Sequence, residues 1–266
     1  MLHHMRRFQA DGPMVVFLHA GGVNSWMWEA IVAETPERAA MDRLMIDLPG
    51  HGESARAAWR SLGAAAAAVE QVIDAARGDK EVALVGLSLG GYVALTLLSR
   101  KPAAYAAALV SGVHAGGMTR RWLMRAVAAA MAPLTPRPFF ARRTAKMLGV
   151  AEHSIDRFVE EAGKTRPASI RRAVIDVIDF EAPPALAACE ARLLVACGGR
   201  EHPLVKSAPV ILRRLVRNCS AYEAAGLGHG WPAENPAQFV RLLGDHLSGG
   251  DLLGGHESGG APGGTV

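Results

Sequence analysis

Short apolar runs, each closed by turn residues, alternate with helical patterns along most of this 266-residue chain. The runs are apolar throughout, which is typical of strands covered on both faces of a parallel sheet. Repeated strand-then-helix units predict an α/β fold with a mostly parallel central sheet flanked by helices. Strands are expected at 13–20, 43–50, 81–86, 106–112, 191–199 and, more weakly, 219–226, with room for one more before residue 13.

One interval breaks this alternation. Residues 114–184 contain only helical patterns and breakers, and about 70 residues are too many for a simple crossover between two strands. They predict a helical cap over the ends of the strands, inserted into a core formed by residues 1–113 and 185–247. Residues 248–266 are rich in glycine and are expected to be a disordered tail.

Composition narrows the choice of partner and compartment. No apolar run approaches the roughly 20 residues of a membrane helix, and the N-terminus lacks the apolar stretch of a secretory signal. The net charge is +4, and the basic residues gathered within 120–172 indicate a solvated helical face, because no aromatic residues are interleaved with them. The odd number of cysteines, without metal-site spacing, favours a reduced cytoplasmic protein. We expect no membrane, nucleic-acid, metal or cofactor partner. The cysteines are Cys189, Cys197 and Cys219.

A single serine stands at the end of the strand expected at 81–86. Residues 86–90, GLSLG, match G-x-S-x-G, the strand-to-helix turn called a nucleophile elbow. Glycine-sized neighbours allow a turn sharp enough to expose the serine hydroxyl. Because the match closes a strand and opens a helix, Ser88 is the candidate nucleophile. The alternative is a glycine-rich turn with an idle serine.

A serine hydroxyl needs a base to take its proton, and the base needs a carboxylate beside it. Among ten histidines, His229 lies in a glycine-rich loop after the last expected strand, from which it can reach the carboxyl edge of the sheet. Glu201 is the first acid after the strand at 191–199, and it gives the chain order serine, acid, histidine. Exposed loop residues are the alternative interpretation of both, with Asp176 and Asp179 as other acids.

Acyl transfer also produces a negative oxygen that needs backbone N–H donors. Leu89 follows the serine at the start of a helix, where the helix dipole favours negative charge. The second donor is expected in the loop at 19–22, HAGG, whose small residues let the backbone approach a ligand. We assign this donor to Gly21 and interpret His19 as a side chain that braces the loop.

Together these motifs resemble the α/β-hydrolase-fold superfamily of esterases and lipases. The resemblance implies a catalytic triad of Ser88, Glu201 and His229, an oxyanion hole formed by Gly21 and Leu89, and a variable cap after the sixth-type strand that shapes the pocket. Two positions depart from the family pattern: alanine stands at position 20 where glycine is usual, and the acid is glutamate rather than aspartate. The stretches that carry the resemblance, in family order, are LHAGG (18–22), DLPGHGES (47–54), GLSLGG (86–91), GGRE (198–201) and GHGWP (228–232).

The elbow holds serine rather than aspartate, which argues against dehalogenase- and epoxide-hydrolase-like chemistry. The expected function is hydrolysis of a small, fairly apolar carboxylic ester or lactone through an acyl-serine intermediate. Thioester, amide or carbon–carbon bond hydrolysis uses the same residues, and a small-molecule receptor or pseudoenzyme on the same fold is the alternative of a different class. Trp26, Met27 and Trp28 either line an apolar substrate pocket or pack as helix residues. Oligomeric state does not follow from the sequence.

Overall fold

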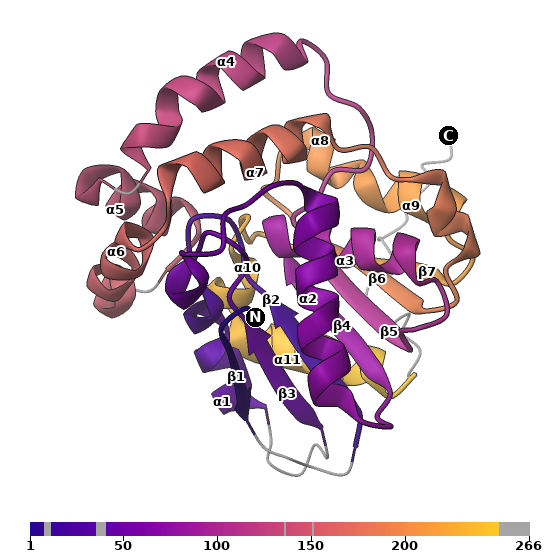
Figure 1. Cartoon of the computed structure of the whole chain (residues 1–266). Coiled ribbons are helices and arrows are strands. Elements are labelled where there is room, and N and C mark those ends of the chain that lie inside the picture. The colour runs from indigo at the N-terminus through magenta and orange to yellow at the C-terminus, as the bar shows by residue number, and fades with distance from the viewer. Residues whose placement is uncertain (8–11, 36–40, 136, 151, 250–266) are drawn as a thin grey trace, which may run out of the picture.

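The computed structural model describes residues 1–7, 12–35, 41–135, 137–150 and 152–249, and these form a seven-stranded sheet covered by helices (Figure 1). The strands are β1 (His4–Arg7), β2 (Met14–Leu18), β3 (Asp42–Ile46), β4 (Val82–Leu87), β5 (Ala107–Ser111), β6 (Arg192–Gly198) and β7 (Cys219–Ala224). Their spatial order is β1-β3-β2-β4-β5-β6-β7. β1 pairs with β3 antiparallel, and every other pair is parallel. The expected mostly parallel sheet is therefore confirmed.

The inner strands bury side chains on both faces, because successive residues of a strand point to opposite sides. Val16 and Leu84 belong to the hydrophobic cluster on one face, and Phe17 and Val85 to the cluster on the other. This two-sided burial explains the uniformly apolar strand sequences. The helices of the core are α1 (Glu29–Glu34), α2 (Leu62–Arg77), α3 (Leu89–Arg100), α8 (Pro203–Lys206), α9 (Ala208–Leu215), α10 (Trp231–Glu234) and α11 (Pro236–Leu247).

The register brings the carboxyl ends of four neighbouring strands to one edge of the sheet. Leu87, at the end of β4, pairs with Ser111, at the end of β5. Gly198, at the end of β6, pairs with Ala224, at the end of β7. Loops that leave β4, β6 and β7 therefore begin at the same edge, although the end of β4 lies more than a hundred residues before the ends of β6 and β7 in the sequence. Functional side chains from these loops can meet there.

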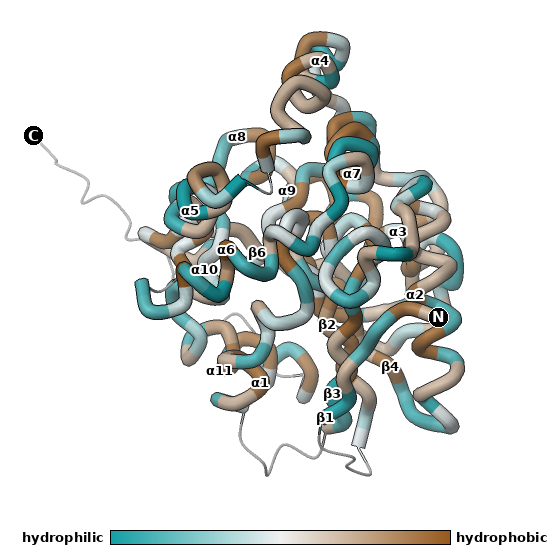
Figure 2. The backbone as a smooth tube through the Cα atoms, turned by 60° about the vertical axis from the view of Figure 1, so that its left-hand side comes forward, coloured by the Kyte–Doolittle hydropathy of each residue, from teal (hydrophilic) through white to brown (hydrophobic). Residues whose placement is uncertain are grey.

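Among the described residues, four α-helices lie between β5 and β6 and extend over this edge (Figures 1 and 2). Polar contacts tie them to the core: the Trp59 indole N–H donates to Asp176 at 2.8 Å, and the Arg166 amide donates to the Gly50 carbonyl at 3.1 Å. The boundaries drawn at 113/114 and 184/185 stay a prediction. The four helices are α4 (Arg121–Met131), α5 (Pro138–Met147), α6 (Ile155–Gly163) and α7 (Pro167–Asp179).

The disordered tail predicted at 248–266 lies outside the described residues, apart from Ser248 and Gly249. Ser248 closes α11, and its amide donates to the Gly244 carbonyl at 3.0 Å. Within the described ranges, no helix combines the length and apolar character needed to cross a membrane.

Candidate active site

Ser88 occupies a strained turn between β4 and α3. Its φ of 52° and ψ of −116° lie in a region that side chains with a Cβ rarely adopt. The flanking glycines are required by close packing: a Cβ on Gly86 would meet the Gly90 carbonyl, and a Cβ on Gly90 would meet the Leu18 carbonyl. The motif thus folds locally as an elbow, as expected from its place between a strand and a helix, and it turns the serine side chain into a cavity.

Glu201 and His229 come together from two different loops. Glu201 follows β6, His229 follows β7, and the Glu201 Oε1 lies 2.8 Å from the imidazole Nδ1. The Glu201 side chain is only 5% exposed, whereas that of His229 is 28% exposed. A carboxylate in this position favours the tautomer that carries its proton on Nδ1, which leaves Nε2 free to accept a proton. This arrangement suits a general base that is oriented by a buried acid.

Two groups that the sequence reasoning missed hold the imidazole in place. Gly112, just after β5, has a φ of 67°, and a Cβ there would lie 2.7 Å from the His229 Cε1. Glu234 accepts a hydrogen bond from the Gly228 amide at 2.8 Å and a second from Arg200 at 2.8 Å, so it braces the loop that carries His229. The role of Gly112 could have been predicted from its position directly after an apolar strand. The role of Glu234 could not, because it joins loops that are distant in the sequence and has no local sequence signal.

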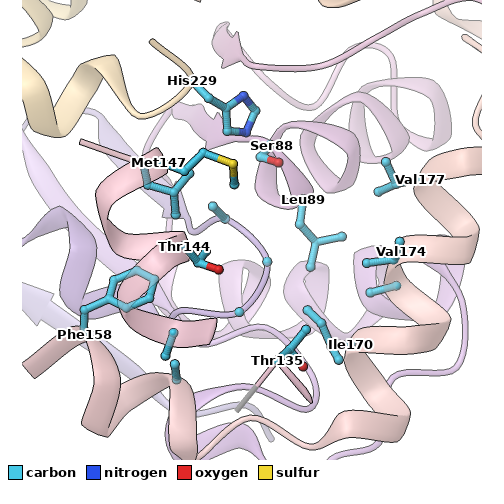
Figure 3. A pocket seen from close by; sticks show the side chains of 17 residues that line it. Ser88, Leu89, Thr135, Thr144, Met147, Phe158, Ile170, Val174, Val177 and His229 are labelled. Carbon is cyan, nitrogen blue, oxygen red and sulfur yellow. The ribbon is translucent and has the colours of Figure 1, made fainter. Parts of the chain in front are cut away.

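Ser88 and His229 both line one cavity of about 270 Å³ between the sheet edge and the helices α5, α6 and α7 (Figure 3). Figure 3 places the His229 ring close to the serine side chain. The remaining acids that the sequence left open lie elsewhere: Asp176 accepts from the Trp59 indole, and Asp179 pairs with Arg125. Among the candidate acids, Glu201 is therefore the one that the structure brings to His229.

Gly21 and Leu89 are neighbours on the wall of the same cavity. A Cβ built on Gly21 would lie 3.7 Å from the Leu89 Cβ, so the two backbones approach closely beside Ser88. The Ala20 amide is already engaged, because it donates to the Met27 Sδ at 3.3 Å. Leu89 begins α3, where the amide N–H groups of the first turn point out of the helix. Both residues thus lie on the cavity wall beside Ser88, and their role as oxyanion donors stays a prediction.

His19 braces the loop that carries Gly21. The Leu48 amide donates to its Nε2 at 2.8 Å, so the proton is on Nδ1, which donates to the Ala20 carbonyl at 2.8 Å. Burial lowers the pKa of His19, and the nearby Asp47 carboxylate opposes this effect only in part. A neutral, fully buried imidazole with both nitrogens occupied acts as a structural strut.

Most of the remaining wall is apolar and comes from α5, α6 and α7 (Figure 3). No Asp, Glu, Lys or Arg side chain lines it among the residues that the structure describes. The sequence predicted a cap in this segment but none of the lining residues, because the faces that amphipathic helices present depend on how the helices pack. The larger side chains on this wall are Met147, Leu148, Phe158, Ile170, Val174 and Val177.

The three residues expected as either pocket lining or helix packing do not line the cavity at Ser88. Trp28 is fully buried in the core, and its ring centroid lies 5.5 Å from that of Phe17 and 5.8 Å from that of Phe239. Trp26 and Met27 line a second cavity of about 450 Å³. They form one short 3₁₀ turn with Trp28, and a single turn points successive side chains in different directions.

Within the described parts of the chain, no group of three or more histidine, cysteine, aspartate or glutamate side chains is placed to hold a metal ion. Cys189, Cys197 and Cys219 form no disulfide. Burial raises the pKa of Cys197 to about 11, and that of Cys219 to about 12. Both cysteines are therefore held as thiols.

A strained serine turn and a histidine–glutamate pair thus lie at the carboxyl edge of a mostly parallel sheet. The alpha/beta hydrolase family model matches residues 15–242, which is most of the chain, and the chain belongs to this family. The expected resemblance is thereby confirmed.

Three curated relatives match a shorter stretch. An esterase of Mycobacterium tuberculosis is 35% identical over 102 residues, which cover 36% of this chain and 31% of that protein. A 2-succinyl-6-hydroxy-2,4-cyclohexadiene-1-carboxylate synthase of an Enterobacter species is 32% identical over 104 residues, 39% of each chain. A pimeloyl-acyl-carrier-protein methyl ester esterase of Methylococcus capsulatus is 37% identical over 95 residues, covering 36% of this chain and 35% of the relative. The matches thus span only about a third of the length of these relatives.

Solved structures share the fold over nearly the whole chain. MenH from S. aureus superposes with a TM-score of 0.77 at 20% identity, covering 94% of this chain and 99% of that one. An esterase from Exiguobacterium antarcticum gives 0.78 at 18% identity, covering 93% and 95%. An enol-lactonase from Burkholderia xenovorans gives 0.75 at 18% identity, covering 93% and 95%. At these identities the likeness describes the fold alone.

Proposed function

We propose that this protein is a serine hydrolase that cleaves a small, fairly apolar carboxylic ester or lactone. The observation that carries the proposal is the 2.8 Å contact between Glu201 and His229 at the mouth of the cavity that holds Ser88. An idle serine would need neither a strained backbone nor a histidine oriented by a buried carboxylate. The names of two curated relatives, both esterases, support the same reaction class.

The reaction would proceed in two halves. His229 Nε2 takes the Ser88 proton as Oγ attacks the ester carbonyl, and the carbonyl π electrons move to oxygen. The amides of Gly21 and Leu89 stabilise that negative oxygen. His229 then returns the proton to the departing alcohol as the carbon–oxygen bond breaks. Water, deprotonated by the same imidazole, attacks the acyl-serine and releases the carboxylic acid, and the proton on His229 returns to Ser88.

The chemistry of the wall limits the substrate. A cavity of about 270 Å³ without a charged side chain favours an uncharged, compact acyl group, because burying an unpaired charge there would be costly. Thr135 and Thr144 are the hydroxyl-bearing residues that its helical wall offers. The Thr135 hydroxyl already donates to the Ala132 carbonyl at 2.7 Å.

The three cysteine thiols form no disulfide, as expected in a reducing compartment. We therefore place the reaction in the cytoplasm.

Fluorophosphonate labelling of the purified protein, located by peptide mass spectrometry, tests the proposal. Labelling at Ser88, and its loss in Ser88→Ala, is the expected result, because only an activated serine beside a working base reacts at an appreciable rate. Hydrolysis of p-nitrophenyl acetate by the parent then reports turnover. A folded parent that is neither labelled nor active would overturn the proposal and favour a small-molecule receptor on the same fold.

A further inference from the structure

A second cavity of about 450 Å³ lies beside the one that holds Ser88. Its wall combines α1, the start of α6 and the segment after His229. Leu87 and Gly230, which line it, are the chain neighbours of Ser88 and His229. The cavity therefore runs along the back of the two candidate catalytic residues, on the side where Trp26 and Met27 lie.

Leu148 and Phe158 line both cavities and so form the partition between them. Phe158, from α6, points toward the catalytic cavity in Figure 3, and it is 1% exposed. The backbone of Leu148 is fixed, because its amide donates to the Thr144 carbonyl at 2.9 Å and its carbonyl packs where a Cβ of Gly230 would otherwise sit. Whether the two cavities connect therefore depends on the side-chain rotamers of Leu148 and Phe158. Rotamers exchange quickly compared with backbone movements.

The sizes of the two cavities explain why a connection would matter. Pockets for small molecules usually measure about 300–1,000 Å³. At about 270 Å³ the catalytic cavity falls just below that range, whereas together with the second cavity it lies well inside it. Alone, the catalytic cavity suits a short acyl group. With the partition open, the site has room for a much longer one.

The wall of the second cavity is mostly apolar, and Leu87, Val150 and Pro232 are among its apolar residues. Arg157 donates to both carboxylate oxygens of Glu29, at 2.8 and 3.0 Å, and its guanidinium lies 5.0 Å from the Trp26 ring centroid. These two charges therefore satisfy each other, and the Glu34 carboxylate is exposed to solvent, so the apolar part of the wall is left to accept hydrocarbon. The ionisable and hydroxyl-bearing side chains that line the cavity are Glu29, Glu34, His153, Ser154 and Arg157.

We propose that the second cavity receives the distal part of an unbranched acyl chain whose carbonyl carbon lies at Ser88, with Leu148 and Phe158 controlling the passage. This inference rests on the proposed esterase function and defines its substrate class as esters of straight-chain fatty acids. A chain of this kind is apolar, flexible and narrow, which matches a path between two side chains.

Filling the second cavity tests the assignment. Ala233 lines this cavity and not the catalytic one, so Ala233→Phe should lower kcat/KM for p-nitrophenyl decanoate about ten-fold or more beyond any change for p-nitrophenyl acetate. Ala30→Phe, at an exposed position on the same wall, should act in the same direction and guards against misfolding of the first variant. Ala237→Phe, an exposed position on α11 outside both cavities, is the matched control and should leave the decanoate-to-acetate ratio unchanged.

Opening the partition should have the opposite effect. Leu148→Ala removes three carbon atoms from the wall shared by the cavities, and the decanoate-to-acetate ratio should rise about ten-fold. If Ala233→Phe and Ala30→Phe change both esters equally, or if Leu148→Ala leaves the ratio unchanged, the two cavities do not share a substrate and the inference is wrong.

A binding measurement separates this inference from the proposed reaction. Methyl decanoate, an uncharged ester that Ser88→Ala should bind without cleaving, should change the fluorescence of this variant in a saturable way that is lost in the double variant with Trp26→Phe, because Trp26 lines the second cavity. Methyl decanoate binding without fluorophosphonate labelling of the parent would support the second cavity and overturn the esterase. Labelling and acetate hydrolysis without a Trp26-dependent signal would do the reverse.

Discussion

The carboxylate of Glu201 lies 2.8 Å from Nδ1 of His229, buried beneath an imidazole that is still partly open to the cavity. The side chain of glutamate is one methylene longer than that of aspartate, and here it spans the distance from the turn after β6 to the ring. The turn is held by its own backbone: the Glu201 amide donates to the Gly198 carbonyl at 3.1 Å, and the Arg200 amide donates to Leu227 at 2.9 Å. These two bonds fix the backbone from which the acid is presented to the ring.

Glu201→Gln should therefore lower kcat for p-nitrophenyl acetate by about two to four orders of magnitude, with little change in melting temperature. A neutral amide can neither stabilise the imidazolium nor enforce its tautomer. Glu201→Asp is the informative companion, because it keeps the negative charge but moves it one methylene away from the ring. Its kcat should lie between that of the parent and that of Glu201→Gln. A glutamine variant as fast as the parent would show that Glu201 is not the acid.

Acid should destabilise this protein below neutral pH because of its buried histidines. Burial, helped by the neighbouring His19, lowers the pKa of His51 to about 3. Between pH 6.5 and about 3, His51 is protonated in the unfolded chain but not in the folded protein. The contribution of His51 to the free energy of unfolding is therefore fully present above pH 6.5 and is lost as the pH falls. One such group contributes up to about 1.4 kcal/mol per pH unit in this window. Urea unfolding at several pH values should show this slope.

His51→Asn is the variant that isolates this contribution. The imidazole Nδ1 lies 3.0 Å from the Pro49 carbonyl, and an asparagine amide can keep a donor in that region without titrating. The variant should lose stability at pH 7.5 but depend less steeply on pH between 6.5 and 4. An unchanged slope would assign the acid sensitivity to other groups, His19 and His246 first, whose pKa values are also lowered by burial.

The elements that follow from the sequence are those that a local pattern specifies. The strands expected at 81–86 and 191–199 are β4 (Val82–Leu87) and β6 (Arg192–Gly198). Ser88 could be assigned because its turn is built from its immediate neighbours, and the parallel topology then predicts which loops can meet it. The order of the strands and their common edge were enough to place Glu201 and His229 near one another.

The features that could not be predicted depend on packing between distant segments. Phe158 and Ile170 line the cavity with Ser88 only because α6 and α7 pack on the core at particular rotations. A helical pattern predicts which face of a helix is apolar, but not the surface against which that face packs. Trp28 is buried in the core, whereas Trp26, two residues earlier, lines a second cavity. The sequence does not distinguish the two tryptophans. The partition formed by Leu148 and Phe158 exists only where the helices and core meet.

A side chain at Gly112 should disable the site without unfolding the protein. Gly112→Ala places a Cβ about 2.7 Å from the His229 Cε1, so the imidazole must move away from its productive position. Because a misplacement of about 1 Å can lower turnover a hundred-fold, we expect at least that loss with p-nitrophenyl acetate.

The matched control for this substitution is Gly78→Ala. Gly78 also has a positive φ, of 55°, but a Cβ there meets nothing within 4 Å. Both alanines should lower the free energy of unfolding by about 1–3 kcal/mol through backbone strain, and only the one at Gly112 should lower activity. Equal activities in the two variants would contradict the packing of Gly112 against the imidazole.

The strain at Ser88 gives the last prediction. With a φ of 52°, the residue carries a backbone conformation that costs about 1–3 kcal/mol for any side chain with a Cβ. Ser88→Ala retains that strain, whereas Ser88→Gly removes it and loses only about 0.4–1 kcal/mol to the greater freedom of glycine in the unfolded chain. Both variants should be inactive, but Ser88→Gly should be the more stable by roughly 1 kcal/mol in urea unfolding. The same pair at Ser220, in β7, should show the opposite order, because a strand backbone suits alanine better than glycine. If glycine is not the more stable residue at position 88, the turn is relaxed and the elbow holds no strain for catalysis to use.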